Sequence, residues 1–490
     1  MMLLIKNGYY CNPANACEGY YNVWIQDGKI DRIEPADGNL PVDRIEPADG
    51  NLPVDRDEPA DGNLSVDRDE PAEENQSADR DESAGRNPSV DGSVSARAGS
   101  FREASGEECT VIDASGCIVA PGLVDVHVHF RDPGFTYKED IETGAAAAAA
   151  GGYTTVVMMA NTSPVIDNED TLRYVLEKGA RTGIHVESCA CVTKGLQGKE
   201  LTDMEALRKA GAAGFTDDGI PLMDALLVRE AMERTARLGV PLSFHEEDKR
   251  YITNNGIHEG AASAHFKIGG SPREAEISLV ERDLKLALET EAFVNIQHIS
   301  TKEAVALVRE AKKHSARVHA EATPHHIALT EEALIQKGSM AKMNPPLRTE
   351  EDRQAIIDGL CDGTIDLIAT DHAPHSAEEK ARPLTQAPSG LIGLETALSV
   401  CYGQLVKSGR MTMMELLRRM STHPAKLYGF EAGDIREGAP ADVVIFSPEE
   451  TWTAEHFRSR SRNTPFLGEQ MTGRVRYTVC GGRIVYNGVS

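Results

Sequence analysis

The sequence is poor in the features of nucleic-acid-binding proteins. Among its 490 residues, aromatic side chains make up only 5%, and 51 basic residues face 77 acidic ones, for a net charge of −26. Binding to nucleic acid needs a basic surface, and single strands also need aromatic side chains for base stacking. The composition therefore argues against nucleic acid as a partner. A small anionic substrate stays compatible with it, because such a substrate responds to the local field of its pocket.

Long apolar runs and paired cysteines are also missing. The longest uncharged stretch, residues 143–166, is interrupted by two glycines and contains Thr, Asn and Pro, so we expect a helix and a buried strand there and no membrane span. The nine cysteines are scattered, odd in number and without a CxxC pair, which is typical of reduced thiols in a cytoplasmic protein. The first ten residues predict a β-strand and not a signal peptide.

An acidic repeat with a period of twelve residues occupies part of the N-terminal region. Residues 31–42 read DRIEPADGNLPV, residues 43–54 are identical, and three diverging copies begin at Asp55, Asp67 and Asp79. Each copy has turn-forming residues and few large apolar ones, so it cannot bury enough surface to offset its loss of conformational entropy. We expect a solvated, duplicated surface loop, the alternative being an interaction tail. Nearly half of the net negative charge lies in this repeat.

Beyond residue 110, strand-like and helix-like runs alternate, which indicates a parallel sheet with crossover helices. Eight strand-like runs match the α/β architecture of a (β/α)8 barrel of the TIM type, with a doubly wound open sheet as the alternative. The expected strands are residues 118–130, 153–160, 183–193, 214–218, 240–247, 293–300, 316–322 and 365–371. The expected helices are residues 138–150, 168–182, 203–213, 223–239, 272–291, 301–314, 394–408 and 412–428.

Both ends of the chain carry short strands with turn signals, which predict one small β-domain built from the two termini. These strands are residues 3–7, 22–34, 109–119, 441–447 and 474–487. The predicted organisation is an N-terminal part of this composite β-domain at 1–35, a disordered acidic insertion at 36–108, a return strand at 109–119, the barrel at 120–430 and a C-terminal part of the β-domain at 431–490.

The strongest chemical signal is the segment DVHVHFRDPG, which begins at Asp125. Alternate side chains of a strand share one face, so Asp125, His127, His129 and Arg131 point together, while the apolar residues between them pack on the other side. Two histidines at positions i and i+2 can bind one metal ion. The Pro-Gly pair that follows ends the strand, which places the histidines at its C-terminal end, the active end of a barrel.

Further metal-binding residue types follow later strands. They are Asp217, Asp218, His245, His298 and Asp371, with His372 and His375 just beyond. Each alone also fits a capped turn or a core histidine, but together they occupy the ends of several strands, and those ends converge only if the sheet closes. Six nitrogen and oxygen ligands suit two divalent ions, with zinc as the first expectation. Two such ions sharing a hydroxide would provide a nucleophile at neutral pH.

Eight motifs resemble those of the type I dihydroorotases of the amidohydrolase superfamily, in the same order. They are DVHVHFRDPG, MANTSPV, GFTDDG, SFHEED, QHIST, KMNPPLR, ATDHAPH and APSGLIGLET. The resemblance extends over nearly all of residues 1–35 and 109–490. It implies a barrel with a composite β-domain and a metal-dependent, reversible interconversion of N-carbamoyl-L-aspartate and L-dihydroorotate in pyrimidine biosynthesis.

The resemblance also implies roles for individual residues. The metal ligands would be His127, His129 and Asp371 for one zinc ion, His245 and His298 for a second, and Asp218 as the bridge between them. Asp371 would also be the general acid/base. The substrate contacts would be Arg131, Asn161, Asn344 and His375, with Ser389 and Gly390 in a loop that closes over the ring. One departure is Ala160, which stands before Asn161 where the family usually has proline.

Two other functions fit part of this pattern. Hydantoinases and allantoinases resemble the chain, but they typically bridge their metals with a carbamylated lysine, and GFTDDG contains none. A non-catalytic dihydroorotase-like scaffold for aspartate transcarbamoylase would lose metal ligands, whereas all six are kept here. We therefore favour an active dihydroorotase, expect a homodimer, and keep an association with aspartate transcarbamoylase as a hypothesis.

Overall fold

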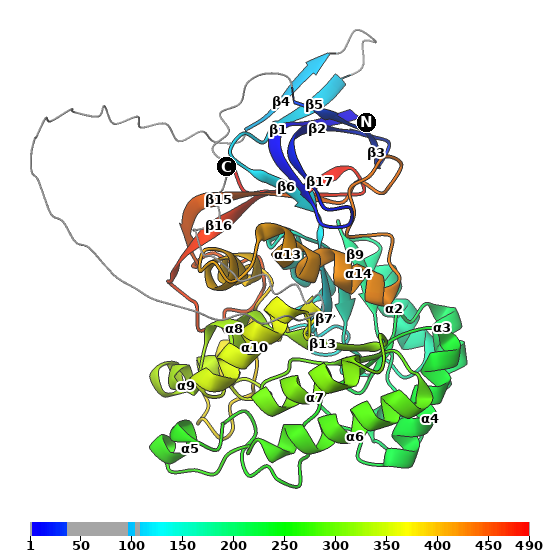
Figure 1. The fold of residues 1–490 in the computed structure, drawn as a ribbon, viewed down its shortest axis with the longest axis vertical. Helices are drawn as coiled ribbons and strands as arrows, with labels where there is room; N and C mark the ends of the chain where they lie inside the picture. Colours follow the sequence, from blue (N-terminus) through cyan, green and yellow to red (C-terminus); the bar gives the residue numbers. More distant parts are fainter. Residues whose placement is uncertain (1, 37–96, 103–107, 490) are drawn as a thin grey trace, which may run out of the picture.

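The computed structural model describes residues 2–36, 97–102 and 108–489 (Figure 1). Most of the acidic repeat lies outside the described residues, so the solvated-loop interpretation stays a prediction. The described residues form a β-sheet contributed by both ends of the chain and, next to it, a barrel surrounded by helices. No helix in these ranges combines the length and the apolar character that crossing a bilayer requires.

The terminal sheet joins strands that are hundreds of residues apart in sequence. Its order is β17-β16-β15-β6-β1-β2-β3, with β5 beside β1 and β4 beside β5. The strands are β1 (Met2–Asn12), β2 (Cys17–Gln26), β3 (Lys29–Pro35), β4 (Arg97–Arg102), β5 (Glu108–Asp113), β6 (Ile118–Pro121), β15 (Val443–Thr453), β16 (Gln470–Cys480) and β17 (Arg483–Asn487). Because β6 pairs with both β1 and β15, the two ends of the chain share one sheet, as the sequence predicts.

Eight parallel strands form the barrel. They are β7 (Leu123–Val128), β8 (Tyr153–Met158), β9 (His185–Ser188), β10 (Phe215–Thr216), β11 (Leu242–Phe244), β12 (Val294–Ile296), β13 (Val318–Ala322) and β14 (Leu367–Ile368). They make two ladders, β7-β8-β9 and β10 to β14. Single parallel bridges, Ala190 to Phe215 and Val128 to His372, join the ladders at both edges. The first strand therefore neighbours the last, which confirms the barrel prediction against an open sheet.

The predicted strand at 118–130 is wrong in one respect, because it is two strands in different sheets. β6 belongs to the terminal sheet and β7 to the barrel, and the chain passes from one to the other at Gly122. A β-carbon at Gly122 would lie 2.1 Å from the hydroxyl oxygen of Thr154, so the backbone can come this close to β8 only with glycine. Both strands are buried and apolar, so periodicity does not separate them.

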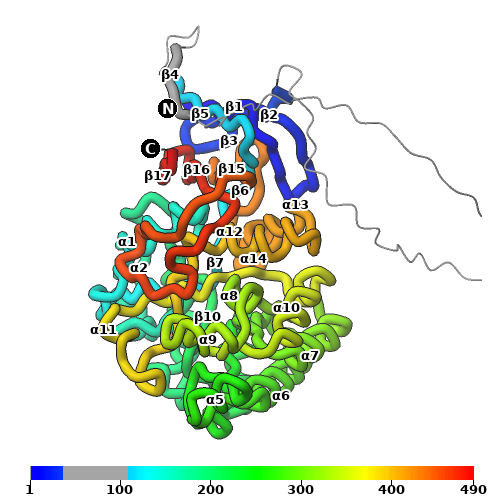
Figure 2. The backbone as a smooth tube through the Cα atoms, turned by 90° about the vertical axis from the view of Figure 1, so that its left-hand side faces the viewer, coloured from blue at the N-terminus to red at the C-terminus, as the bar shows by residue number. Residues whose placement is uncertain are grey.

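Helices cover the outside of the barrel (Figure 2). The longer ones are α1 (Ile141–Ala150), α2 (Glu169–Gly179), α3 (Met204–Ala210), α4 (Ala225–Leu238), α6 (Glu274–Thr290), α7 (Lys302–Lys312) and α10 (Glu350–Asp362). Shorter ones are α5 (Ala261–Phe266), α8 (Pro324–Ala328), α9 (Glu331–Lys337), α11 (Ala377–Lys380), α12 (Ala397–Cys401), α13 (Met413–Leu417) and α14 (His423–Tyr428). In both views, α13 and α14 lie between the terminal sheet and the rest of the barrel.

Several elements were not predicted from the sequence, among them the short helices α5, α8, α9 and α11, the longer helix α10 and the strand β4. Helix α10 lies between the last two barrel strands, where we expected no helix. Strand β4 lies inside 36–108, the range expected to be disordered, and pairs antiparallel with β5. That expectation is therefore wrong for residues 97–102.

Candidate metal centre

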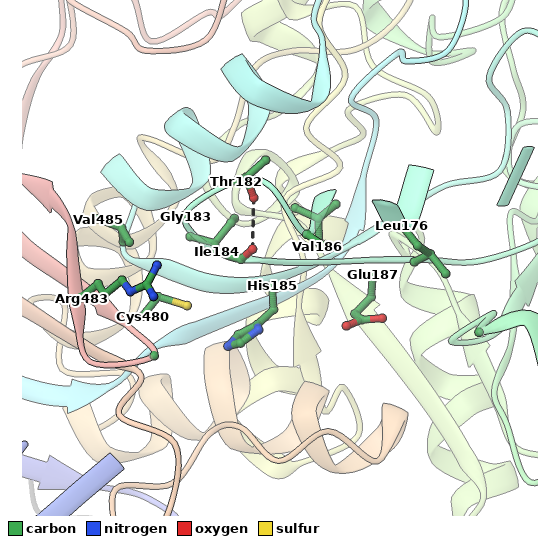
Figure 3. Close-up of a pocket in the computed structure, with 13 residues that line it drawn as sticks. Leu176, Thr182, Gly183, Ile184, His185, Val186, Glu187, Cys480, Arg483 and Val485 are labelled. Atoms are coloured by element: carbon green, nitrogen blue, oxygen red, sulfur yellow. Dashed lines mark hydrogen bonds between the residues drawn. The ribbon is translucent and has the colours of Figure 1, made fainter. Parts of the chain in front are cut away.

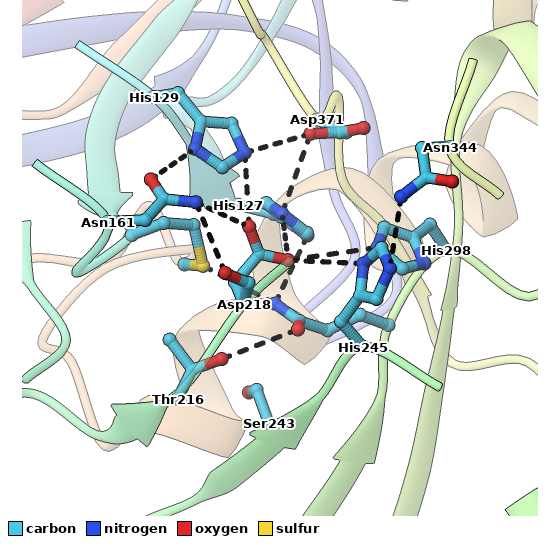
Figure 4. A network of polar contacts seen from close by, with 12 residues as sticks. His127, His129, Asn161, Thr216, Asp218, Ser243, His245, His298, Asn344 and Asp371 are labelled. Atoms are coloured by element: carbon cyan, nitrogen blue, oxygen red, sulfur yellow. Dashed lines mark hydrogen bonds and ion pairs between the residues drawn. The ribbon is translucent and has the colours of Figure 1, made fainter. Parts of the chain in front are cut away.

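The C-terminal ends of the barrel strands bring all six predicted metal ligands together (Figure 4). His127 and His129 lie at the end of β7, Asp218 follows β10, His245 follows β11, His298 follows β12 and Asp371 follows β14. None of the six side chains is more than 10% exposed. Parallel strands of a closed barrel point their C-terminal ends at one rim, so residues far apart in sequence meet there.

The Asp218 carboxylate lies at the centre of this group. Its Oδ1 is 3.5 Å from His127 Nε2, 3.5 Å from His245 Nδ1 and 3.8 Å from His298 Nε2. Its Oδ2 is 3.5 Å from His129 Nε2. One carboxylate thus faces histidines of both predicted ligand sets, which is the placement of a bridging ligand.

Asp371 and the remaining histidine contacts complete the cluster. Asp371 Oδ1 lies 3.0 Å from His129 Nε2 and 3.5 Å from His127 Nε2. The ring nitrogens His245 Nδ1 and His298 Nε2 are 2.9 Å apart, a separation that suits two ligands of one cation. The buried His127 Nε2 has no hydrogen-bond partner among the described residues. Four imidazoles and two carboxylates, with no sulfur among them, fit a divalent cation of the zinc type.

Glu321 orients His127 and is the residue of this centre that sequence reasoning missed. It is fully buried on β13, and its Oε1 lies 2.6 Å from His127 Nδ1. Its Oε2 accepts a hydrogen bond of 3.0 Å from Asn295 Nδ2. With Nδ1 held by a carboxylate, the Nε2 atom of His127 is left for a cation. An acidic residue inside the apolar strand VHAEA is the sequence signal that could have identified it.

Two asparagines predicted to contact substrate lie against histidines of the predicted metal-ligand set. Asn161 Oδ1 is 3.0 Å from His129 Nδ1, and its Nδ2 donates to Asp218 Oδ2 at 3.0 Å. Asn344 Nδ2 lies 3.2 Å from His245 Nε2, whereas its buried Oδ1 has no partner in the part of the chain that the structure describes. Both side chains therefore help to set the ring orientation of a ligand.

The two carboxylates of the cluster are held in their ionised form. Burial alone would raise the pKa of Asp218, but the charge of His127 and hydrogen bonds from the neighbouring histidines hold that pKa well below its usual range. Burial opposes ionisation of Asp371 in the same way, and the charges of His127 and His129 lower its pKa as well. Ionised carboxylates are what cation binding requires.

Three of the nine non-glycine residues with a positive φ in the described part of the chain lie at this rim. Three residues of the site have a left-handed backbone, with φ of 60° at Arg131, 34° at His298 and 48° at Asp371. Each such conformation costs about 1–3 kcal/mol for a residue with a side chain. It persists because the surrounding contacts hold the side chain where the site needs it.

Arg131 lies beside the cluster with most of its donors uncommitted. Its Nε donates to Pro374 O at 3.3 Å. In the described ranges, no carboxylate lies within 4.0 Å of its guanidinium, although Asp218 and Asp371 are close enough to influence its pKa. A guanidinium placed in this way can bind an incoming carboxylate through two parallel hydrogen bonds.

The predicted closing loop is tied to His375 and to two buried lysines. His375 Nδ1 faces the Lys138 ammonium at 3.4 Å, so Nε2 carries the proton and donates to Ser389 O at 2.8 Å. Lys380 Nζ donates to Pro388 O and Gly390 O, both at 3.0 Å. Lys342 Nζ donates to Leu384 O at 2.8 Å and Ala387 O at 2.7 Å. Burial lowers the pKa of Lys380 to about 7 and that of Lys342 to about 8.

The aspartates next to the ligands hold backbone segments. Asp217 Oδ1 accepts from Val192 N at 2.8 Å and Thr193 N at 3.1 Å, which fixes the loop after β9. Asp125 Oδ1 accepts from His127 N at 3.0 Å and Thr370 N at 3.2 Å, which joins the first barrel strand to the last. Their contacts are those of supporting groups beneath the cluster.

The chain is similar to proteins of known family. Residues 118–485 match the model of the Amidohydrolase family. The chain is 56% identical over 391 residues to the dihydroorotase of Clostridioides difficile, and the aligned region covers 80% of this chain and 93% of that enzyme. It is 51% identical over 382 residues to the dihydroorotase of Clostridium acetobutylicum, with 78% and 90% covered.

Solved structures of the same fold are more distant. The L-hydantoinase from Arthrobacter aurescens matches with a TM-score of 0.76 at 22% identity, over 99% of this chain and 96% of that one. The dihydropyrimidinase from Brevibacillus agri matches with a TM-score of 0.75 at 20% identity, over 100% and 96%. Identities this low show a shared fold alone. The match to the family model and the much higher identity to the curated relatives show that the chain belongs to the dihydroorotases of the amidohydrolase family.

Proposed function

We propose that the residues of this centre bind two zinc ions and interconvert N-carbamoyl-L-aspartate and L-dihydroorotate. The observation that carries the proposal is the placement of Asp218 between two sets of histidines, with Asp371 against one set and the uncommitted Arg131 beside it. His127, His129 and Asp371 would hold one cation, His245 and His298 the other, and Asp218 both. When bound, the cations would lower the pKa of a water molecule and polarise the carbonyl that it attacks.

Asp371 is the group that moves the proton. Its Oδ1 faces the histidines, which leaves Oδ2 to take a proton from the attacking water. In the hydrolytic direction a carbon–oxygen bond forms, the ring carbon–nitrogen bond breaks, and Asp371 returns the proton to the leaving nitrogen. In the cyclising direction the same proton travels back, and water leaves.

Arg131 selects the substrate class. Dihydroorotate carries a carboxylate next to its ring, and the guanidinium can bind both of its oxygens. Hydantoin lacks that carboxylate. His375 and the loop at Ser389 and Gly390 would then cover the ring, since Lys342 and Lys380 hold the loop at the rim.

The assembly of the enzyme stays a prediction. A homodimer is the expected state, and an association with aspartate transcarbamoylase is a separate hypothesis. All six ligand positions carry metal-binding residues, so a purely structural scaffold is the weaker interpretation.

A substrate comparison tests the proposal. Purified protein supplied with Zn²⁺ should consume dihydroorotate, followed by ultraviolet absorbance, and should leave hydantoin and allantoin unchanged. Arg131→Met should raise KM for dihydroorotate roughly 10- to 100-fold, because a charged hydrogen-bonding partner of the carboxylate is lost. Turnover of hydantoin at a rate similar to that of dihydroorotate would contradict the assigned role of Arg131.

A further inference from the structure

A second group of metal-binding side chains lies at the opposite end of the barrel. His185 is the first residue of β9, whereas the centre described above follows the last residues of the strands. The His185 ring borders a cavity of about 620 Å³ between the start of β9 and the turn that joins β16 to β17 (Figure 3). Cys480, the last residue of β16, lines the same cavity.

Three donor atoms of different chemistry converge there. His185 Nε2 lies 3.1 Å from Asp442 Oδ2. Donor atoms of His185, Asp442 and Cys480 all lie within 4.8 Å of one another. Figure 3 shows the Cys480 side chain beside the His185 ring. The three residues come from a barrel strand, from the segment before β15 and from the end of β16, so they meet only through the fold.

The surroundings hold two of these donors in place. The Asp442 and Cys480 side chains are buried, and the Gly481 backbone N–H donates to Asp442 Oδ1 at 2.7 Å, which leaves Oδ2 facing His185. The Cys480 thiol lies 3.7 Å from Thr154 O. The His185 side chain is 48% exposed, so the group can be reached from solvent.

We propose that His185, Asp442 and Cys480 bind one divalent transition-metal cation of the Zn²⁺ or Co²⁺ class. Nitrogen, oxygen and sulfur from three residues, with a further position open to the cavity, is a common arrangement for such ions. The thiolate favours them over Mg²⁺ and Ca²⁺, which prefer oxygen ligands. Binding releases two protons to solvent, that of the Cys480 thiol and the one between His185 Nε2 and Asp442, and replaces the contact between His185 and Asp442 with two bonds to the ion.

The position of this site gives the ion a structural effect. His185 belongs to the barrel, and Asp442 and Cys480 belong to the terminal sheet segments. One bound ion would therefore link the barrel to the terminal sheet. Because binding selects the folded form, the melting temperature of the protein should rise with cation concentration.

Cobalt spectroscopy distinguishes this site from the first one. The proposed active-centre ligands include no sulfur, so a thiolate-to-cobalt charge-transfer band in the near ultraviolet would come from a site outside that centre, and Cys480 is the thiol of the proposed site. We expect the band to appear when full-length protein is titrated with Co²⁺ and to saturate at one equivalent above the active-centre ions. Cys480→Ser and His185→Gln should each abolish the band and the part of the rise in melting temperature that follows saturation of the active-centre ions, and should keep dihydroorotate turnover.

Cys361→Ser is the matched control, because Cys361 is a partly exposed thiol whose sulfur contacts Arg410 O. This variant should keep the band. His185 is half-exposed, so its replacement removes a donor without opening the core, which separates loss of binding from loss of folding. A wild-type protein without a thiolate band at saturating Co²⁺ would overturn the proposal, as would a band that survives Cys480→Ser.

Discussion

The two ends of the barrel present the same residue types in different ways. At the C-terminal rim, four histidines and Asp371 are buried around the Asp218 carboxylate. Three of the histidines, His127, His129 and His245, each contact a further polar side chain through the ring nitrogen that does not face Asp218. At the N-terminal end, one half-exposed histidine meets a buried aspartate and a cysteine. The rim also contains residues with a strained backbone, whereas none of the three residues at the other end has a positive φ.

This difference separates catalysis from binding. Chemistry needs donors held in one geometry before the substrate arrives, and the supporting contacts and strain at the rim are the cost of that preorganisation. Binding alone needs only that donors come within reach of one ion. In a closed barrel of parallel strands, active-site residues come from the C-terminal ends of the strands, so we expect donors held in one geometry at that end only. Each of the following variants tests whether the two ends differ in this way.

Asp371→Asn should have the largest effect. The amide cannot move the proton, and it is a poorer cation ligand, so kcat for dihydroorotate should fall roughly 10²- to 10⁴-fold. Asp442→Asn is the matched change at the other end and should leave kcat within about twofold of wild type. Steady-state kinetics on both variants measure the contrast. Equal losses in the two variants would remove the distinction between the ends.

Glu321→Gln should come next. The variant weakens the hold on His127 Nδ1, so cation affinity or activity should fall roughly 10- to 100-fold. Asp217→Asn is the control, because Asp217 is also buried but binds the Val192 and Thr193 N–H groups. It should lower the melting temperature while leaving cation affinity unchanged. Competition with a chelator gives the affinities, and an unchanged value for Glu321→Gln would show that His127 needs no orienting partner.

Lys380→Met should change the loop at the rim and the pH dependence of stability. The folded-state pKa of Lys380 is lowered to about 7 from an ordinary 10.5, so between these values the unfolded chain binds a proton that the folded chain does not. The free energy of unfolding of the wild type should therefore rise with pH above about 7, and the variant should lose that part of the rise.

Denaturant unfolding at pH 7, 8 and 9 measures this slope, since the contribution of Lys342 is common to both proteins. Loss of the contacts to Pro388 O and Gly390 O should also raise KM more than it lowers kcat. A variant with the wild-type slope and the wild-type KM would show that Lys380 neither titrates nor positions the loop.

Deleting residues 43–90 should have the smallest effect. The flanking segments, β3 and β4, belong to the terminal sheet and not to the barrel (Figure 1). Turnover per active site should stay within about twofold of wild type, because all the residues proposed for the centre lie after the repeat in the sequence. A large loss of turnover would link the repeat to the active end.

The sequence predicts the ligand residues at the strand ends better than it predicts the residues that hold those ligands and the rim loop in place. The alternation after residue 110 identified the barrel, and five separate strand ends carried the six ligand residues that the structure brings together. Glu321 was missed because its contact with His127 joins strands about 190 residues apart, and no local pattern encodes it. Lys342 and Lys380 were missed because their partners are backbone carbonyls, which no side-chain pattern in the sequence identifies.

Helix α10 was missed although the sequence contains a start signal. Thr349 and Asp352 form a capping box, and Ile356, Ile357 and Leu360 supply a buried face. The polar first turn hid this face from a search for apolar periodicity. The break between β6 and β7 at Gly122 was missed for another reason. The apolar run continues through both strands, and the chain changes sheet where Gly122 lies close to Thr154.

Zinc titration of metal-free protein tests the central claim most directly. Dihydroorotate turnover should be absent without added cation, should rise with Zn²⁺, and should reach its plateau when the ions required by the six rim residues are bound, as counted by elemental analysis. The same titration on Cys480→Ser should give the same plateau activity with one fewer ion per chain. Full turnover by the metal-free protein, or no turnover at any zinc content, would contradict the account.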